Sequence, residues 1–298
     1  LHSYEKIRTE IYDQSTTASE VIADSIIDSI NACQGRTFRL GLSTGVTPVS
    51  LYKWLTKKYQ EGKVSFSNVE VYSIDEYYPY GKGEPQSRNS ILHSSLLNAV
   101  DIKEENIHIP DGSVPEDKIT AYCEEYDKLV RGLDMLVIGM GEMAQVGFNE
   151  AGSSPVSRTR TVLLSYQSRK RQGKNFNGDF KHTPSQAITI GIDTMMSAKK
   201  IVLMAWGEDK ANAVKHVCEC NPDYEYPASL LQGHQNICCY VDETAGSLLT
   251  RVVSPWLVGP CDWTRKFIRK AVVWLCQEVH KPILKLTQKD YLEHSLGE

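Results

Sequence analysis

Polar side chains that could carry out chemistry follow a short apolar run in the middle of the chain. The run 133–138 is typical of a buried parallel strand, and the segment 139–150, Gly-Met-Gly-Glu-Met-Ala-Gln-Val-Gly-Phe-Asn-Glu, comes directly after it. Its glycines let the backbone turn sharply. Because ligands of open α/β sheets bind at the carboxyl ends of the strands, we expect Gln145 and Glu150 to point into a crevice there.

A second polar segment, 41–48, lies between a predicted strand at 38–42 and a predicted helix at 48–59. Its hydroxyl and backbone N–H groups, together with the helix N-terminus, are suited to bind a phosphate. The alternative is an ordinary turn in which Thr47 caps the helix. The candidate phosphate-binding residues are Ser43, Thr44, Gly45, Val46 and Thr47.

Two adjacent carboxylates, Asp75 and Glu76, follow the predicted strand 69–74. Successive side chains on a strand point to opposite sides, so only one of the two can face the crevice. A carboxylate positioned there can act as a general acid–base. The alternative is a structural role, since most aspartates at strand ends cap a turn or a helix.

These segments together resemble the glucosamine-6-phosphate deaminases, also called isomerases. The family's signature loop reads roughly G-x-G-x-D-G-H-I-x-F-N-E-P, and its Asp-Glu-Tyr and Ser-Arg-Thr-Arg motifs recur at 75–77 and 157–160. The resemblance covers roughly residues 10 to 250. It implies conversion of glucosamine 6-phosphate to fructose 6-phosphate and ammonia, with no metal or organic cofactor. The 6-phosphogluconolactonases share this fold but end the loop with Phe-Pro.

The resemblance implies roles for individual residues. Asp75 matches the base that moves a proton between C2 and C1 of the open-chain sugar. Lys210, in Gly207-Glu-Asp-Lys-Ala, matches a lysine that binds the sugar phosphate, although a lysine near a helix start is usually a solvated surface residue. Lys174 stands where gap-free counting places a substrate-binding arginine, although Arg169, Lys170 and Arg171 lie close by. A lysine there keeps the charge but loses the bidentate fork.

The signature loop also departs from the family pattern. The ring-opening histidine is Gln145, and the aspartate that holds it is Met143. An amide can bond the ring oxygen but cannot donate and recover a proton, and losing a general acid–base typically costs about 10²–10⁴ in rate. Glu150 is retained and could partly substitute. Ala144 replaces a glycine, which matters if that residue needs a positive φ.

Two further positions concern phosphate affinity and regulation. Val46 replaces a glycine or serine, so the loop loses backbone freedom and a possible hydroxyl. Ser153 and Arg160 match residues that bind N-acetylglucosamine 6-phosphate in allosteric members, which makes them a candidate effector site. The lysine expected two residues later is Val162, so the match is incomplete.

Composition restricts the partners. With a formal net charge of −4 over 298 residues, the chain has no general attraction for nucleic acid or an anionic membrane, and no apolar run approaches the roughly 20 residues that span a bilayer. No apolar signal core opens the sequence, so we expect a cytoplasmic protein with reduced cysteines.

His216, Cys218 and Cys220 lack a second ligand pair, so we expect no metal. Sugar-phosphate enzymes of this kind are commonly oligomeric, which favours a homo-oligomer.

Apolar segments alternate between strand and helix patterns, with a further helix expected at 91–100 and further strands at 161–164, 187–190, 201–205 and 236–241. This alternation predicts a three-layer α/β/α fold with a mainly parallel, Rossmann-like sheet. We expect a deaminase-like domain over 1–250 and a C-terminal helical extension over 251–298, interpreted as a linker toward a further domain. Three hypotheses are open: a working deaminase with impaired ring opening, a sugar-phosphate-binding or regulatory module with decayed catalysis, and an enzyme for another hexose phosphate such as 6-phosphogluconolactone.

Overall fold

The computed structural model describes residues 4–33, 35–176, 178 and 180–296, and a seven-stranded sheet lies at their centre. Its strands are β1 (Arg8–Tyr12), β2 (Phe38–Leu42), β3 (Val69–Ser73), β5 (Ile107–His108), β6 (Met135–Gly139), β9 (Ile201–Ala205) and β10 (Ile237–Asp242). Their order is β1-β10-β9-β6-β2-β3-β5, and all neighbours are parallel. Because the strands are parallel, the loops that follow β2, β6 and β9 leave the same edge.

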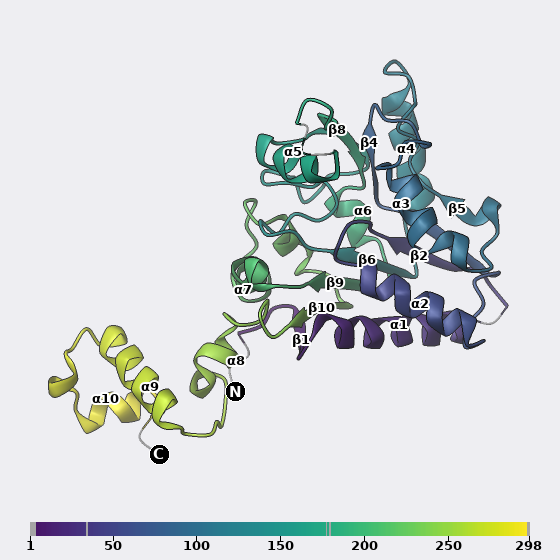
Figure 1. Cartoon of the computed structure of the whole chain (residues 1–298). Helices are drawn as coiled ribbons and strands as arrows, with labels where there is room; N and C mark the ends of the chain where they lie inside the picture. The colour runs from purple at the N-terminus through teal and green to yellow at the C-terminus, as the bar shows by residue number, and fades with distance from the viewer. Residues whose placement is uncertain (1–3, 34, 177, 179, 297–298) are drawn as a thin grey trace.

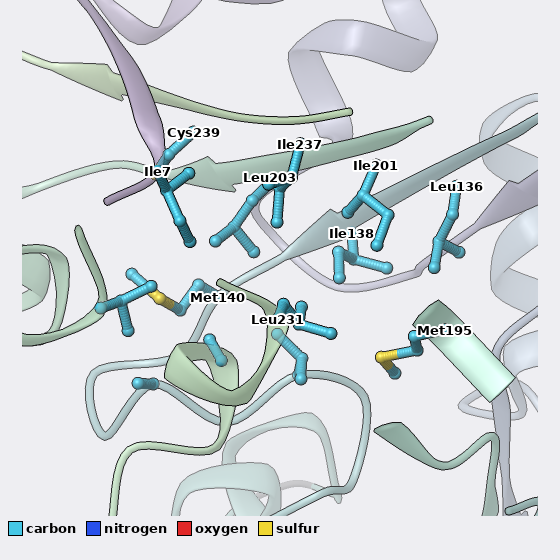
Figure 2. Packing of buried hydrophobic residues seen from close by; sticks show 14 of the residues in the cluster. Ile7, Leu136, Ile138, Met140, Met195, Ile201, Leu203, Leu231, Ile237 and Cys239 are labelled. Atoms are coloured by element: carbon cyan, nitrogen blue, oxygen red, sulfur yellow. The ribbon is translucent and has the colours of Figure 1, made fainter. Parts of the chain in front are cut away.

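Helices cover both faces of this sheet. They are α1 (Ser15–Ala32), α2 (Val49–Gln60), α3 (Arg88–Ser95), α4 (Ile119–Val130), α6 (Ile192–Met196) and α7 (Ala211–Glu219), while α5 (Tyr166–Gln172) and α8 (Thr250–Val253) lie outside the two core clusters. Along β6, Met135 and Val137 pack with α1, α2 and α3, whereas Leu136 and Ile138 pack with α4, α6 and α7. Figure 2 shows the cluster that contains Leu136 and Ile138, in which side chains of β6, β9 and β10 lie opposite Met195 of α6. Burial on both faces explains why these strands read as continuous apolar runs.

A smaller antiparallel sheet adjoins the main one. It has the order β4-β8-β7 and consists of β4 (Asp75–Tyr78), β8 (Gln186–Thr189) and β7 (Arg160–Leu163). Asp75 pairs with Thr189 in its register. The main chain passes directly from β3 into β4, and Figure 1 shows β4, β8 and α5 together at the top of the view.

The chain continues after α8 into a helical extension. Its helices are α9 (Arg265–Glu278) and α10 (Gln288–Glu293), which Figure 1 shows at the lower left, away from the main sheet. Thr264 caps α9, and Thr287 and Asp290 form a capping box at α10. No helix among the described residues is long and apolar enough to cross a membrane.

The predicted fold class is confirmed: the structure has a mainly parallel sheet flanked by helices, followed by a helical extension. Several element assignments need correction. The strands predicted at 161–164 and 187–190 belong to the small sheet, and Asp75 begins β4 instead of ending β3. The helix predicted at 91–100 is α3, which begins at Arg88 because Ser87 caps it, and ends at Ser95.

Candidate active site

The loops that follow β2 and β6 lie against each other at the carboxyl edge of the sheet. The N–H of Gly139 donates to Oγ of Ser43 at 3.1 Å. A Cβ on Gly139 would lie 2.9 Å from Cβ of Thr47, so only glycine allows this approach. The indole of Trp206, just after β9, donates to the carbonyl of Thr47 at 2.9 Å. Three predicted segments therefore meet at one place.

The signature loop (139–150) is a tight turn closed by its own backbone. The N–H of Gly141 donates to the carbonyl of Gln145, and the N–H of Ala144 donates to the carbonyl of Gly141, both at 2.9 Å. Oε1 of Gln145 accepts from the N–H of Met143 at 3.0 Å. The Gln145 carboxamide also lies over Gly141, where a Cβ would come within 2.2 Å of its Cδ. In this structure the Gln145 side chain thus stabilises its own loop, through a hydrogen bond to Met143 and packing against Gly141.

Ala144 adopts a left-handed backbone conformation, with φ of 57°. An alanine in this region is strained by roughly 1–2 kcal/mol relative to the right-handed conformation. Its methyl group is fully buried, and its carbonyl accepts from the N–H of Ala228 at 2.9 Å. An alanine at this position therefore adds strain, and the surrounding core holds the loop in shape.

Asp75 lies beside the signature loop. Its side chain is buried, and a Cβ on Gly147, which has φ of 57°, would lie 3.6 Å from its Oδ2. Its Oδ1 lies 3.3 Å from Nε of Arg88, and each side chain is 7% exposed. Burial, the largest contribution, raises the pKa of Asp75, and the charge of Arg88 acts in the opposite direction.

Glu76 turns to the other side and holds the start of α3. Its carboxylate accepts from the N–H groups of Tyr77 at 2.8 Å, Arg88 at 2.9 Å and Asn89 at 3.0 Å. A carboxylate at a helix N-terminus satisfies donors that have no partner within the helix. Of the two adjacent carboxylates, Asp75 faces the signature loop and Glu76 anchors a helix.

Glu150 ends the signature loop beneath the segment that leads to α5. Its Oε2 accepts from the N–H of Ser165 at 3.1 Å, while its Oε1 is buried without a hydrogen-bond partner. The hydroxyl of Ser153 donates to the carbonyl of Glu150 at 2.6 Å. Arg160 donates through Nη1 to Oδ1 of Asn149 at 3.0 Å. The two candidate effector residues, Ser153 and Arg160, thus both donate hydrogen bonds to residues of the signature loop.

Basic groups lie on the segments that follow β9 and on or after α5. Lys210 directly precedes α7, its side chain is 18% exposed, and its ammonium pairs with the neighbouring Asp209. Lys174 lies after α5 and is exposed. Arg171 of α5 reaches Glu142 of the signature loop, with Nη2 and Oε1 2.5 Å apart. In the structure, therefore, Arg171 and not Lys174 makes the ion pair that ties α5 to the loop.

Sequence reasoning missed Arg88, and it noted Arg171 only as a neighbour of Lys174. Arg88 lies 13 residues after Asp75 in an unremarkable polar segment, and only the fold of α3 brings the two together. The capping pattern of Ser87 with Ser90 could have placed a helix start at Arg88. No sequence signal pairs Arg171 with Glu142, because the pair depends on how α5 packs.

The described residues contain no group of three or more His, Cys, Asp or Glu side chains that could hold a metal ion. The sequence cluster on α7 is divided by the helix. His216 stacks on Tyr226 with ring centroids 4.0 Å apart, whereas Cys218 is fully buried in the core. All eight cysteines are free thiols.

Known proteins resemble both the sequence and the fold. Residues 13–146 match the model of a family described as glucosamine-6-phosphate isomerases/6-phosphogluconolactonase. A putative glucosamine-6-phosphate deaminase-like protein of Bacteroides thetaiotaomicron is 41% identical over 299 residues, which cover 99% of this chain and 45% of that protein. The chain therefore spans less than half the length of that relative.

Two further relatives are covered over most of their length. Glucosamine-6-phosphate deaminase 2 of Bacillus subtilis is 39% identical over 214 residues, covering 70% of this chain and 85% of the relative. A solved structure, described as a monomeric glucosamine-6-phosphate deaminase, superimposes with a TM-score of 0.77 at 31% identity, covering 81% of this chain and 100% of the other.

Proposed function

We propose that this chain, which belongs to the glucosamine-6-phosphate isomerase/6-phosphogluconolactonase family, converts glucosamine 6-phosphate to fructose 6-phosphate and ammonia. The relatives reported above are named glucosamine-6-phosphate deaminases or deaminase-like, so this reaction is favoured over hydrolysis of 6-phosphogluconolactone.

One observation carries the proposal. Seven buried side-chain atoms of the described residues have no hydrogen-bond partner, and four of them belong to the site: Oγ1 of Thr44, Oδ1 of Asp75, Nε of Arg88 and Oε1 of Glu150. Buried polar atoms are normally paired, so their concentration at one sheet edge indicates a surface suited to a polar ligand. Oδ1 of Asp75 and Nε of Arg88 lie 3.3 Å apart in an ion pair. A hexosamine phosphate offers the hydroxyl, amino and phosphate groups that could satisfy the remaining two atoms, on Thr44 and Glu150.

The phosphate end is proposed to bind the loop after β2. Gly45 has φ of 109° and Val46 is 89% exposed, so the tip of the loop from Ser43 to Thr47 is open to solvent. Lys210 supplies a positive charge, which pairs in the structure only with the adjacent Asp209 among the described residues. Lys174 is proposed as a second cation from the α5 side. A phosphate would then replace Asp209 as the partner of Lys210.

The sugar end is proposed to lie over Asp75. A single carboxylate that reaches both C1 and C2 can take a proton from one carbon and return it to the other. Asp75 is buried beside Gly147 of the signature loop, where an added Cβ would lie 3.6 Å from its Oδ2. Glu150 is the remaining carboxylate of the site and is proposed to take part in ring opening.

A second candidate function, a sugar-phosphate-binding module with decayed catalysis, is favoured by the state of Gln145. Its amide oxygen is occupied by the N–H of Met143, and an amide cannot replace a histidine as a proton donor and acceptor. The decisive variant is Gln145→His combined with Met143→Asp. For a working scaffold, the pair should raise turnover by more than the product of the single changes.

A coupled assay for ammonia on the purified chain tests the main proposal. Ammonia release from glucosamine 6-phosphate supports the deaminase. Binding of that sugar by calorimetry without release, in both the parent chain and the double variant, supports the binding module instead. Hydrolysis of 6-phosphogluconolactone in a parallel assay would support the third hypothesis and contradict the first.

Further proposals concern regulation and assembly. An effector site at Ser153 and Arg160 is still proposed, although both side chains are engaged with the loop in the structure. We propose a cytoplasmic location, which the free cysteines support. We also propose that 1–250 forms the deaminase-like domain and that 251–298 is an extension toward a further domain. We also propose that the chain forms a homo-oligomer, which light scattering would test. The solved structure that is 31% identical is described as monomeric.

A further inference from the structure

We propose that Arg88 is a positioning residue that holds the carboxylate of Asp75 in its charged form and fixes its direction toward the sugar. The inference rests on the proposed role of Asp75 as the base. Arg88 acts through Asp75 and needs no contact with the substrate.

The ion pair between the two residues is buried. Nε of Arg88 and Oδ1 of Asp75 are 3.3 Å apart, and both side chains are 7% exposed. A carboxylate that loses its water without gaining a cation becomes protonated, because burial penalises the charged form. A protonated Asp75 could not accept a proton from C2. The guanidinium, which stays charged in proteins, supplies the opposite charge that keeps Asp75 ready.

The backbone of Arg88 is fixed independently of Asp75. Arg88 is the first residue of α3, and the carboxylate of Glu76 accepts from its N–H at 2.9 Å. The hydroxyl of Ser87 caps the same helix by accepting from the N–H of Ser90. Glu76 directly follows Asp75 in the chain. The two adjacent carboxylates therefore bind the same residue in different ways. Glu76 fixes the backbone of Arg88 at the start of α3, and Asp75 pairs with its side chain.

The side chain of Arg88 is fixed by two aromatic rings. Its guanidinium carbon lies 4.7 Å from the ring centroid of Tyr77 and 5.1 Å from that of Phe148. Cation–π contacts of this kind favour the charged head group when it is shielded from water. Phe148 belongs to the signature loop, so the loop itself holds the cation in place.

The other titratable groups around Asp75 do not replace the cation. Three tyrosines, Tyr52, Tyr77 and Tyr126, exert an electrostatic influence on it or receive one from it, and all are neutral near neutral pH because burial raises the pKa of each. Glu76 is nearby, with a pKa raised by burial to about 7. Among the residues that the structure describes, Arg88 is the cation in contact with Asp75.

The test is a titration of Asp75 that does not depend on turnover. The chain is labelled with ¹³C at aspartate carboxyl groups, and the Asp75 signal is assigned by its loss in Asp75→Asn. In Arg88→Met, a flexible apolar side chain fills the space between the rings. Its titration midpoint for Asp75 should lie about 1–3 pH units above that of the parent, the usual effect of an adjacent arginine on an aspartate. An unchanged midpoint would overturn the inference.

Two variants make the result specific. Arg88→Lys keeps a charge without the planar group, so its midpoint should lie between those of the parent and Arg88→Met. Arg36→Met removes a comparable partner, since Nη1 of Arg36 lies 2.9 Å from Oδ2 of Asp134. Asp134 precedes β6, at the opposite edge of the sheet, so the Asp75 midpoint should not move. Equal midpoints for Arg88→Lys and Arg88→Met would show that only stacking matters.

Activity gives a second readout. If the parent exchanges the C2 proton with solvent, the acidic limb of its pH profile should move to higher pH in Arg88→Met, in step with the midpoint of Asp75. A parent without exchange contradicts the proposed function, whereas the titration still decides the role of Arg88. Circular dichroism confirms that each variant is folded, and Arg88→Gln serves as the neutral variant if Arg88→Met does not fold.

Discussion

Two buried aspartates in this molecule, Asp75 and Asp127, each have an arginine partner, yet their surroundings differ. Asp127 of α4 accepts from the N–H and hydroxyl of Thr159, from the hydroxyl of Thr194 and from Nε and Nη2 of Arg158. Asp75 has one ionic contact, and its Oδ1 makes no hydrogen bond. The first carboxylate is saturated with donors and the second is not.

The pKa values of the two groups move in opposite directions. Burial acts to raise the pKa of Asp127, but hydrogen bonds from Thr194, Thr159 and Arg158 outweigh it and hold the pKa below its ordinary value. At Asp75 burial prevails over Arg88, and the pKa is raised. Hydrogen bonds to the charged form account for the difference. A saturated carboxylate stabilises the fold, while an unsaturated one remains available to a ligand.

The largest effect should follow from removing the unsaturated carboxylate. In Asp75→Asn, exchange of the C2 proton of the sugar with solvent should fall by about 10²–10⁴, the usual cost of losing a general acid–base. Substrate binding should change little, because the phosphate contacts are elsewhere. Exchange is followed by NMR in deuterated water, with Asp193→Asn on α6 as the control. Persistent exchange in Asp75→Asn would make Asp75 structural and remove the contrast with Asp127.

Removing the saturated carboxylate should instead unfold the protein more easily. Asp127→Ala leaves buried hydroxyl and guanidinium donors unpaired, and breaking a buried pair typically costs about 3–5 kcal/mol. Urea unfolding measures the loss. The matched control is Asp24→Ala, because Asp24 pairs with Lys58 but its side chain is 51% exposed. A loss equal to that of the control would mean that the hydrogen bonds of Asp127 contribute little.

Lys210 extends the comparison to a cation with few partners. Lys210→Ala should weaken binding of a hexose 6-phosphate by about 1.5–3 kcal/mol, the range for a hydrogen bond to a charged group, with little change in stability. Calorimetry measures the affinity, and Lys57→Ala is the control because Lys57 is 57% exposed and pairs with Glu61. Equal affinity in the parent and Lys210→Ala would remove Lys210 from the phosphate site.

The smallest effect is a difference in the pH dependence of stability. The folded pKa of Asp127 is lowered, so its contribution is present above the ordinary aspartate pKa of 3.8 and is lost as pH falls through the folded pKa. The folded pKa of Asp75 is raised, so its contribution is present below 3.8 and is lost as pH rises through the folded pKa.

These signs predict opposite trends in urea unfolding. The difference in unfolding free energy between the parent and Asp127→Asn should grow with rising pH. The difference between the parent and Asp75→Asn should shrink over the same range. Trends of the same sign would show that the two carboxylates are not distinguished by their donors.

The arrangement of the site could be predicted in outline from the sequence. Strands that are buried on both faces give continuous apolar runs, so β2, β3, β6, β9 and β10 were all predicted. The edge strand β1, with the sequence Arg-Thr-Glu-Ile-Tyr, and the two-residue β5 were not. They pair on one side only and carry polar residues, so their strand pattern is weak.

The sequence by itself determined which groups are available. Parallel strand order puts the segments after β2, β6 and β9 at one edge, and the residue types at Asp75, Gln145, Glu150 and Lys210 set what they can donate or accept. It also fixed what is missing, because no fold gives an amide at Gln145 the acid–base chemistry of a histidine.

Only the tertiary structure decided how these groups are used. The folding of Gln145 onto Gly141, the φ of 57° at Ala144 and the pairing of Asp75 with Arg88 depend on contacts between segments that are packed together, not on local pattern. The pKa of a carboxyl group depends on its burial and on the donors that reach it. Both quantities depend on neighbours in space and are set when the chain folds. The residues next to Asp75 and Asp127 in the sequence do not reveal them.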